Sequence, residues 1–290
     1  MRLVSHLEGG VERLGVDRNG RVIAVSELLE NGPSTMAGLL ADPDALDRLR
    51  GAVTATLRSP TAGTPIEGLT LLAPVPRPGK IIAVGLNYAD HAAEGGRPAP
   101  EEPVLFAKFP TAVVGPGAEI TWDPTLTLQV DVEAELAVII GRTARHVPLE
   151  SALDHVLGYT CLNDVSARDL QLRDKQFTRA KSLDTFCPMG PALITADEIT
   201  DPQALRISST VDGEVWQDGT TADMIFPIAE LIAFCSRAFT LEPGDVIATG
   251  TPAGVGLYHD PPRFLRDAAR VVIEIDAIGR LSNRCREMPA

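Results

Sequence analysis

The fold is decided by one stretch of sequence, Val130-Asp131-Val132-Glu133-Ala134-Glu135-Leu136-Ala137-Val138-Ile139-Ile140. Side chains alternate between the two faces of a strand, so Asp131, Glu133 and Glu135 are expected on one face. The apolar run that follows, 137–140, predicts that the strand enters the core. No Lys or Arg is interleaved to offset the three carboxylates. The stretch therefore predicts a buried strand with three acidic side chains on one face.

Two interpretations of this acidic face are open. It is either a solvated face, which is common, or a set of hard oxygen ligands held on a rigid strand. Ligands of the second kind suit Mg²⁺, Mn²⁺ or Ca²⁺.

Beyond Lys80 the chain continues in short β-like runs broken by Gly and Pro, with fewer helical stretches. The expected strands are Ile81–Val84, Val104–Lys108, Val130–Ile140, Ala192–Thr195, Arg206–Val211, Asp245–Thr249 and Val271–Ile275. The expected helices are Leu149–Val156, Ser166–Asp174 and Ile228–Ala238. Strands and helices do not alternate regularly, which argues against a doubly wound parallel sheet. The predicted class is α+β with β predominant.

A small N-terminal domain is expected before this region. The Asn19-Gly20 step favours a tight hairpin between strands at 11–16 and 21–25. A helix is expected to begin with Asp42 as N-cap, with Leu46, Leu49, Val53 and Leu57 on one face. Residues 59–79 contain many Pro and Gly and are interpreted as a connector. The predicted division is a small α+β domain at 1–73 and a catalytic domain at 74–290.

Composition excludes several classes of function. The net charge is −13, which disfavours nucleic acid and anionic membrane surfaces as partners. The longest apolar runs are far shorter than the roughly 20 residues of a spanning helix, and no signal-peptide pattern is seen at the start. A cytoplasmic location is therefore the expectation. The four cysteines lie far apart, which argues against structural zinc and predicts unpaired thiols.

A third metal ligand would have to come from a second segment. Tyr159–Asn163 is expected to be a strand, followed by Asp164 and a helix with Ser166 as N-cap and Asp169 in a capping box. Arg168 and Gln171 would then share one face of that helix. These groups could hold a metal and a substrate carboxylate together, or the segment is an ordinary helix start with a surface Arg.

Another candidate is His91, which follows the strand at 81–84 and precedes Glu94 by three residues. On one helical turn the two side chains can hydrogen-bond, which would fix the imidazole tautomer and make His91 a general base. Gly95 and Gly96 would end the turn and permit lid motion. The alternative is a solvent-facing His–Glu pair. A second His at zinc-binding spacing is lacking.

Two further segments contribute candidates. Lys181 offers a compact cation that could stabilise an enolate oxygen beside a metal. The segment 249–256 is a Gly-rich turn that could present backbone N–H groups or the Thr251 hydroxyl to an anion. It lacks the pattern of a P-loop or a Rossmann fingerprint, and taken alone it is only a turn.

In this order and spacing, these segments resemble the fumarylacetoacetate hydrolase family from about Lys80 to the C-terminus. The motifs that carry the resemblance are Gly85-Leu86-Asn87-Tyr88-Ala89-Asp90-His91, Asp131–Leu136, Asn163–Gln171, Ala180-Lys181-Ser182 and Thr249-Gly250-Thr251-Pro252. Segment 177–191 is more similar to the bacterial sugar-acid and aromatic-degradation branch than to the animal enzymes. The resemblance implies a mixed β-roll, often preceded by a small N-terminal domain, and a homodimer.

The resemblance also implies roles for particular residues. Glu133, Glu135 and Asp164 would hold Mg²⁺, Mn²⁺ or Ca²⁺, with Asp131 nearby. His91 and Glu94 would activate water, and Lys181 would stabilise the enolate. The implied substrate contacts are Arg168, Gln171, Thr251, Gly250 and Tyr88.

The expected function is hydrolysis of a C–C bond in a 2,4-dioxo acid of the acylpyruvate type through a pyruvate enolate. Oxaloacetate decarboxylation and isomerisation of a 2-hydroxy-diene-dioate use the same metal–enolate chemistry and stay open as alternatives. A chain that binds a metabolite without turnover is a further alternative. The sequence lacks a G-x-S-x-G motif, which argues against a nucleophilic hydrolase.

Overall fold

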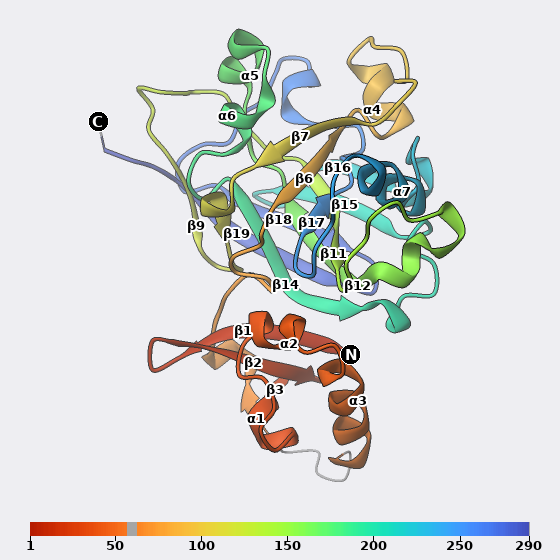
Figure 1. The fold of residues 1–290 in the computed structure, drawn as a ribbon. Coiled ribbons are helices and arrows are strands. Elements are labelled where there is room, and N and C mark those ends of the chain that lie inside the picture. The colour runs from red at the N-terminus through yellow and green to blue at the C-terminus, as the bar shows by residue number, and fades with distance from the viewer. Residues whose placement is uncertain (57–62, 290) are drawn as a thin grey trace.

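The computed structural model describes residues 1–56 and 63–289. Figure 1 shows a small N-terminal unit stacked against a larger unit that contains the rest of the chain. The elements of the small unit are β1 (Arg2–Glu8), β2 (Val11–Arg18), β3 (Arg21–Ala24), α1 (Val25–Leu28), α2 (Met36–Ala41), α3 (Ala45–Thr56), β4 (Thr64–Pro65), the 3₁₀ turn η1 (Ile66–Gly68) and β5 (Thr70–Leu71).

The larger unit consists mainly of strands. They are β6 (Ile81–Gly85), β7 (Val104–Lys108), β8 (Val113–Val114), β9 (Glu119–Trp122), β10 (Val130–Asp131), β11 (Ala134–Ile140), β12 (Val156–Asn163), β13 (Ser166–Ala167), β14 (Cys187–Thr195), β15 (Arg206–Val211), β16 (Glu214–Thr220), β17 (Val246–Ala248), β18 (Arg270–Ile275) and β19 (Gly279–Glu287). Its helices are α4 (Ala89–Glu94), α5 (Arg168–Asp174), α6 (Phe177–Lys181) and α7 (Ile228–Ala238), with 3₁₀ turns η2 (Pro110–Ala112), η3 (Leu149–His155), η4 (Ala196–Glu198), η5 (Thr221–Asp223) and η6 (Gly256–Tyr258). The predicted α+β class with β predominant is confirmed.

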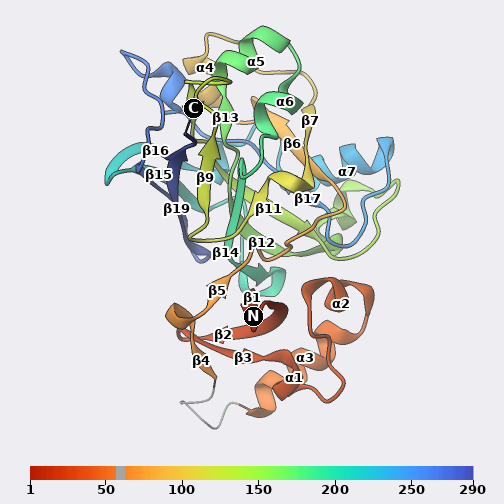
Figure 2. The same cartoon turned by 90° about the vertical axis from the view of Figure 1, so that its left-hand side faces the viewer.

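A 12-stranded sheet runs through both units in the order β4-β3-β2-β1-β14-β12-β11-β17-β6-β7, with β5 paired to β1 and β8 paired to β14. The larger unit also contains a 5-stranded sheet in the order β16-β15-β18-β19-β9 and a short pair of strands, β10 and β13. The pairing of β1 with β14 is antiparallel and joins the sheet of the N-terminal unit to that of the larger unit. Figure 2 shows this junction between the two units from the side. A boundary at residue 73 stays a prediction.

The alternation of side chains along β11 divides the core into two clusters. Leu136, Val138 and Ile140 belong to a cluster that includes Ile207 and Ile273 of the second sheet. Ala137 and Ile139 face a different cluster, which also contains Leu14 of β2 and residues of α2 and α3. Every residue of β11 is buried. The strand therefore lies in the interior, as its apolar run predicts.

In the N-terminal unit the hairpin is confirmed and the helix start is wrong. Asn19 and Gly20 both have positive φ, at 52° and 79°, as the favoured two-residue hairpin turn requires. Asp42 is the C-cap of α2, and α3 begins only at Ala45, two residues after the predicted first helical position, although the carboxylate of Asp42 accepts the N–H of Asp44. Leu49 is buried as predicted, and Leu57 lies outside the described residues.

Two other expectations need correction. The described part of the expected connector at 59–79 includes β4 and β5, which pair with β3 and β1 and extend the N-terminal sheet. The stretch expected as a helix at 149–156 is the 3₁₀ turn η3, which leads into β12. The helices and strands at 228–238, 104–108 and 206–211 have the predicted bounds. Within 1–56 and 63–289, helices of the length and apolarity that a membrane crossing demands are lacking.

Asn87 ties three segments of the larger unit together. Its buried Nδ2 donates to the carbonyls of Phe226 and Thr249 at 3.1 and 2.8 Å, and its Oδ1 accepts the N–H of Phe226 at 2.8 Å. We expect Asn87→Ala to lower the free energy of unfolding by roughly 2–4 kcal/mol, because buried backbone groups lose their partners. Urea denaturation measures this loss, and a change below about 0.5 kcal/mol would contradict it.

Candidate metal and catalytic site

The site forms where the start of β11 meets the end of β12. The two strands are antiparallel, with Ala134 opposite Asn163 and Glu135 opposite Leu162. The first residues of β11 therefore lie beside the residues that follow β12. This register places Glu133 and Glu135 beside Asp164, although 29 residues separate Asp164 from Glu135 in the chain.

The strand expected over 130–140 is interrupted at Val132 and Glu133. The N–H of Val132 donates to the side chain of Asp131, and the N–H of Glu133 donates to Oδ1 of Asn163 at 3.1 Å. These bonds replace ladder bonds, so the strand divides into β10 and β11. The interruption corrects the expectation that the carboxylate of Asp131 shares one strand face with those of Glu133 and Glu135.

The carboxylate of Asp131 has partners of its own. It accepts Nε of Arg168 at 2.8 Å and the backbone N–H groups of Gly256 and Leu257 at 2.8 and 3.0 Å. It therefore anchors Arg168 and the loop at 256–257 beside the site.

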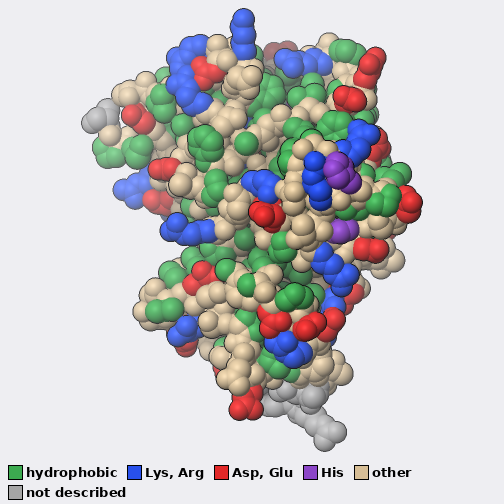
Figure 3. All heavy atoms as spheres, viewed as in Figure 1, with side chains coloured by type: hydrophobic (Ala, Val, Ile, Leu, Met, Phe, Trp, Pro, Cys, Tyr) green, Lys and Arg blue, Asp and Glu red, His purple; other side chains and the backbone are tan. Residues whose placement is uncertain are grey.

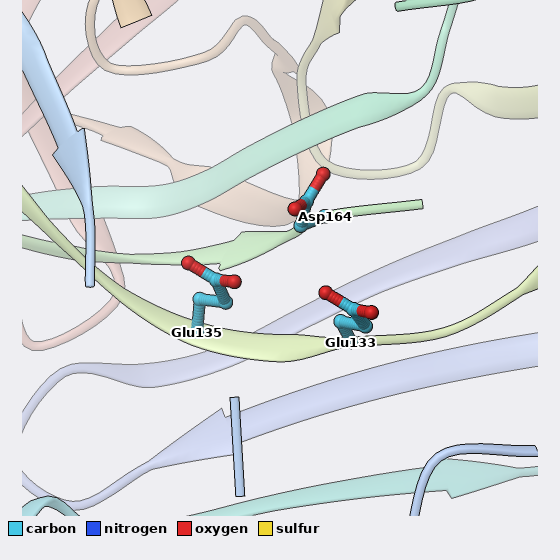
Figure 4. Close-up of side chains that lie close together, drawn as sticks. All are labelled: Glu133, Glu135 and Asp164. Carbon is cyan, nitrogen blue, oxygen red and sulfur yellow. The ribbon is translucent and has the colours of Figure 1, made fainter. Parts of the chain in front are cut away.

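The three remaining carboxylates converge. One oxygen each of Glu133, Glu135 and Asp164 lies within 4.8 Å of the other two, and all three residues are buried. Figure 4 shows the two glutamates rising from one strand toward the aspartate at the end of its neighbour. Buried carboxylates at such spacing repel one another unless a cation lies among them. The donor set is the one that a hard divalent ion such as Mg²⁺ or Mn²⁺ prefers.

Two buried lysines offset part of this charge. Nζ of Lys181, at the end of α6, lies 2.6 Å from Glu133 and 2.8 Å from Asp164. Nζ of Lys108, at the end of β7, lies 2.5 Å from the other oxygen of Asp164 and also donates to the carbonyl of Lys181. Lys108 is not among the site residues predicted from the sequence. A lone Lys that ends an apolar strand is the only signal that the sequence offers for it.

The charges around the cluster separate the pKa values of its two glutamates. Burial would raise the pKa of Glu133, but Lys181 and Arg168 outweigh it and lower the pKa to about 2. Burial, together with the charges of Asp164 and Glu133, holds the pKa of Glu135 well above its ordinary value. Glu135 accepts the N–H of Gly250 at 2.9 Å but has no ion pair with any described cation. A bound cation would therefore favour the charged form of Glu135.

His91 and Glu94 form the expected pair on α4. Nδ1 of His91 lies 2.7 Å from Oε1 of Glu94, whose other oxygen accepts the N–H of Gly254 at 2.9 Å. This contact commits Nδ1 to Glu94, so Nε2 is the ring nitrogen left for proton transfer. The ring of Tyr258 lies 6.0 Å from that of His91. The pair is partly buried, which excludes the solvent-facing alternative.

Arg168 and Gln171 lie on one face of α5, as their spacing predicts. Nη1 of Arg168 lies 2.7 Å from Glu133 and 3.0 Å from Oε1 of Gln171. Its Nη2 is buried and has no hydrogen-bond partner among the residues that the structure describes. A buried guanidinium with a spare donor is suited to an anionic ligand.

The predicted capping box at Ser166 is wrong. Ser166 belongs to β13, where its hydroxyl donates to the carbonyl of Asp164 at 2.9 Å, and Ala167 precedes the first helical residue. The carboxylate of Asp169 accepts the Thr127 hydroxyl at 2.7 Å and the N–H of Leu128. Asp169 also accepts the N–H of Leu170 in the first turn of α5 at 2.8 Å, but the reciprocal bonds of a capping box with Ser166 are not formed.

Two of the last three candidates form structural hydrogen bonds, whereas the buried hydroxyl of the third, Tyr88, has no hydrogen-bond partner among the described residues. The Thr251 hydroxyl donates to the carbonyl of Ala134 at 2.8 Å and accepts Nε2 of Gln217 at 2.6 Å. Gly250 has a φ of 99°, which favours glycine, and its N–H binds Glu135. Tyr88 is fully buried, and burial raises the pKa of its phenol well above the ordinary value. Substrate contact by these three residues stays a prediction.

A cavity of about 330 Å³ connects these groups to solvent. Its walls include seven of the eleven candidates, and the other four, Asp164, Glu94, Gly250 and Tyr88, do not line it. The lining residues are Val84, Gly85, Leu86, His91, Arg97, Phe106, Glu133, Glu135, Arg168, Gln171, Leu172, Lys175, Phe177, Lys181, Thr251, Leu257 and Tyr258. The volume is at the lower end of the range for small-molecule sites, roughly 300–1,000 Å³.

All four cysteines are buried and unpaired, as expected.

The β-rich fold and a carboxylate cluster that could hold a divalent metal are consistent with a β-roll enzyme, and comparison with known proteins gives the family. Residues 80–286 match the model described as fumarylacetoacetate (FAA) hydrolase, C-terminal. The chain therefore belongs to the fumarylacetoacetate hydrolase family, as the sequence motifs predict.

Relatives within the family bear several names. The human mitochondrial oxaloacetate tautomerase FAHD2A is 43% identical over 98% of this chain and 91% of its own length. The Bacillus subtilis oxaloacetate tautomerase YisK is 51% identical over 76% of this chain and 74% of its own. The structure of a maleylpyruvate hydrolase from Sphingobium with manganese(II) and pyruvate aligns over the whole of both chains with a TM-score of 0.81 and 34% identity. The family is thus shown, whereas the names cover more than one reaction.

We expect Glu135→Gln to weaken Mn²⁺ binding at least about 30-fold, because the amide keeps the shape of the side chain and removes one anionic ligand. Isothermal titration calorimetry at neutral pH measures the dissociation constant. Glu30→Gln, which changes an exposed carboxylate of the N-terminal unit, is the matched control. Equal affinities of Glu135→Gln and the native protein would remove Glu135 from the ligand set.

Proposed function

We propose that this protein interconverts the keto and enol forms of oxaloacetate, using a divalent metal. The observation that carries the proposal is that His91, with Nε2 uncommitted, lines the same small cavity as Glu133, Glu135 and Lys181. That arrangement supplies a base, a cation site and an ammonium group for one 2-oxo acid. The names of the human and Bacillus subtilis relatives, which are 43% and 51% identical to this chain, favour this reaction over others of the family.

Glu133, Glu135 and Asp164 would hold the metal, with Mg²⁺ or Mn²⁺ as the first choice and Ca²⁺ as an alternative. When bound there, such an ion supplies Lewis-acid polarisation of the 2-oxo group and offsets the charge of the cluster. Manganese in the Sphingobium structure supports this choice of metal.

His91 would move the proton that defines the reaction. Its Nε2 takes a proton from C3 of the keto acid, the C–H electron pair forms the C2–C3 double bond, and the 2-oxo oxygen gains the negative charge. Glu94 holds Nδ1 at 2.7 Å and stabilises the imidazolium formed in this step. Return of a proton from the imidazolium of His91 to that oxygen then completes the enol and restores the neutral base, and the reverse sequence returns the keto form.

Lys181 and Arg168 would orient the substrate. The ammonium of Lys181 is close to Glu133 and Asp164, where it can also stabilise a developing oxyanion. Burial would lower the pKa of Lys181, but Asp164 and Glu133 raise it above its ordinary value, so the group stays charged at neutral pH. Nη2 of Arg168, together with Gln171, would bind the carboxylate next to the 2-oxo group.

Hydrolysis of an acylpyruvate is the second candidate. The same His91–Glu94 pair can take a proton from water for attack on a C4 carbonyl, and the structural similarity to a maleylpyruvate hydrolase favours this reaction. Decarboxylation of oxaloacetate and isomerisation of an unsaturated 2-oxo diacid need the same enolate.

A cytoplasmic location and a homodimer stay predictions, and some relatives are named as mitochondrial.

A panel of substrates tests the proposal. We expect the protein with Mg²⁺ or Mn²⁺ to convert enol-oxaloacetate to the keto form at a higher rate than it cleaves acylpyruvates or maleylpyruvate. The loss of the enol absorbance measures the rate of tautomerisation. Chelation by EDTA should abolish the acceleration. Faster cleavage of an acylpyruvate than tautomerisation would replace the first candidate with the second.

His91→Ala is the accompanying variant. The loss of a general base should lower kcat about 10²- to 10⁴-fold. Mn²⁺ affinity should stay within about twofold of the native value, since His91 does not belong to the group of Glu133, Glu135 and Asp164 that would hold the ion. An unchanged kcat would exclude His91 as the proton carrier.

A further inference from the structure

The cavity has a second cationic end that the proposed mechanism does not use. Arg97, just beyond α4, and Lys175, at the C-terminal end of α5, both line the cavity and are exposed at its mouth. Neither side chain has an ion pair or hydrogen bond with another side chain in the described part of the chain, whereas the inner cations Arg168 and Lys181 are paired with buried carboxylates. Two charged donors at the mouth are therefore available to a ligand.

The mouth is unusual for a chain of this charge. The net charge is −13, yet among the residues that the structure describes the acidic ones on the cavity wall are Glu133 and Glu135, both in the carboxylate cluster. In Figure 3, Lys and Arg side chains gather at the upper end of the molecule, where α5 lies in Figure 1. A divalent cation in the cluster would make the cavity wall more positive still. The electrostatics thus favour a ligand with more than one negative charge.

Apolar side chains form part of the cavity wall. Phe106 and Phe177 pack edge to face with their ring centres 5.4 Å apart, and Leu172 and Leu257 also line the cavity. A cavity that combines apolar side chains with several cations suits a short carbon chain that carries more than one carboxylate.

The backbone fixes where the two cations emerge. Lys175 adopts a left-handed conformation with φ of 60°, which ends α5 at the cavity mouth. Arg97 follows Gly96, whose φ is 62°, and its N–H donates to the carbonyl of Ala92 at 2.9 Å. The two cations therefore reach the cavity wall from two different elements, Arg97 from the turn after α4 and Lys175 from the end of α5.

We propose that Arg97 and Lys175 bind the distal carboxylate of the substrate and thereby select 2-oxo dicarboxylates over monocarboxylates. The inference rests on the proposed function in one respect, namely that the carboxylate next to the 2-oxo group occupies the inner end beside Arg168. The two residues determine specificity and do not contact the reacting atoms.

The test compares two inert ligands that differ only at the distal group. Malate has both carboxylates but cannot enolise, and its 4-methyl ester lacks the distal charge. Titration calorimetry with the Mn²⁺-loaded protein should give malate at least about tenfold tighter binding than the ester. In the double variant Arg97→Gln/Lys175→Gln the preference should fall to about twofold or less.

Arg173→Gln is the matched control, because it removes an exposed cation from α5 that does not line the cavity. It should keep the preference for malate. The inference is overturned if the native protein binds the ester as well as malate, if it binds neither ligand, or if the double variant keeps the native preference.

Failure here is separate from failure of the proposed function, since neither ligand is turned over. If the native protein prefers malate but does not tautomerise oxaloacetate, the distal site is supported and the proposed reaction is contradicted. If it tautomerises oxaloacetate but shows no preference for malate, the proposed reaction is supported and the distal site is contradicted.

Discussion

The antiparallel register of β11 with β12 is the constraint on which the site depends. It brings Glu133, Glu135 and Asp164 together from two segments of backbone, and a shift of one residue would turn the glutamates to the opposite face. The interruption at Val132 and Glu133 completes the geometry, because it lets Asn163 bind the N–H of Glu133 at the point where the ladder begins. The site is therefore a consequence of strand pairing.

Charge balance is the second constraint. The cluster buries four carboxylates, those of Asp131, Glu133, Glu135 and Asp164, against three cations, those of Lys108, Arg168 and Lys181. One negative charge is left in excess, which is consistent with the raised pKa of Glu135. Burying an uncompensated charge costs several kcal/mol. A divalent cation would reverse the sign of the cluster and make the cavity attractive to an organic anion.

Local patterns in the sequence predicted the parts of the site that depend on short spacing. The three-residue separation of His91 and Glu94 gives their hydrogen bond, and that of Arg168 and Gln171 gives theirs. The family resemblance, not the strand pattern, selected Glu133, Glu135 and Asp164 from the acidic residues. The hairpin at Asn19 was readable because its turn requires a positive φ at both residues.

The rest depends on tertiary contacts that a single sequence does not display. Asp131 leaves the expected acidic face because its own carboxylate binds Val132 and Arg168. Ser166 fails as a cap because its hydroxyl turns back to Asp164. Lys108 lies 56 residues from Asp164, so nothing in its own strand indicates that it neutralises that carboxylate. The positions of Arg97 and Lys175 at one cavity mouth likewise follow from the fold.

The central claim is that one divalent cation is held between β11 and the end of β12. Anomalous diffraction at the manganese edge from crystals soaked in Mn²⁺ tests it most directly. The account predicts one strong peak at bonding distance from oxygens of Glu133, Glu135 and Asp164. A peak elsewhere, with these three carboxylates free of metal, would contradict it.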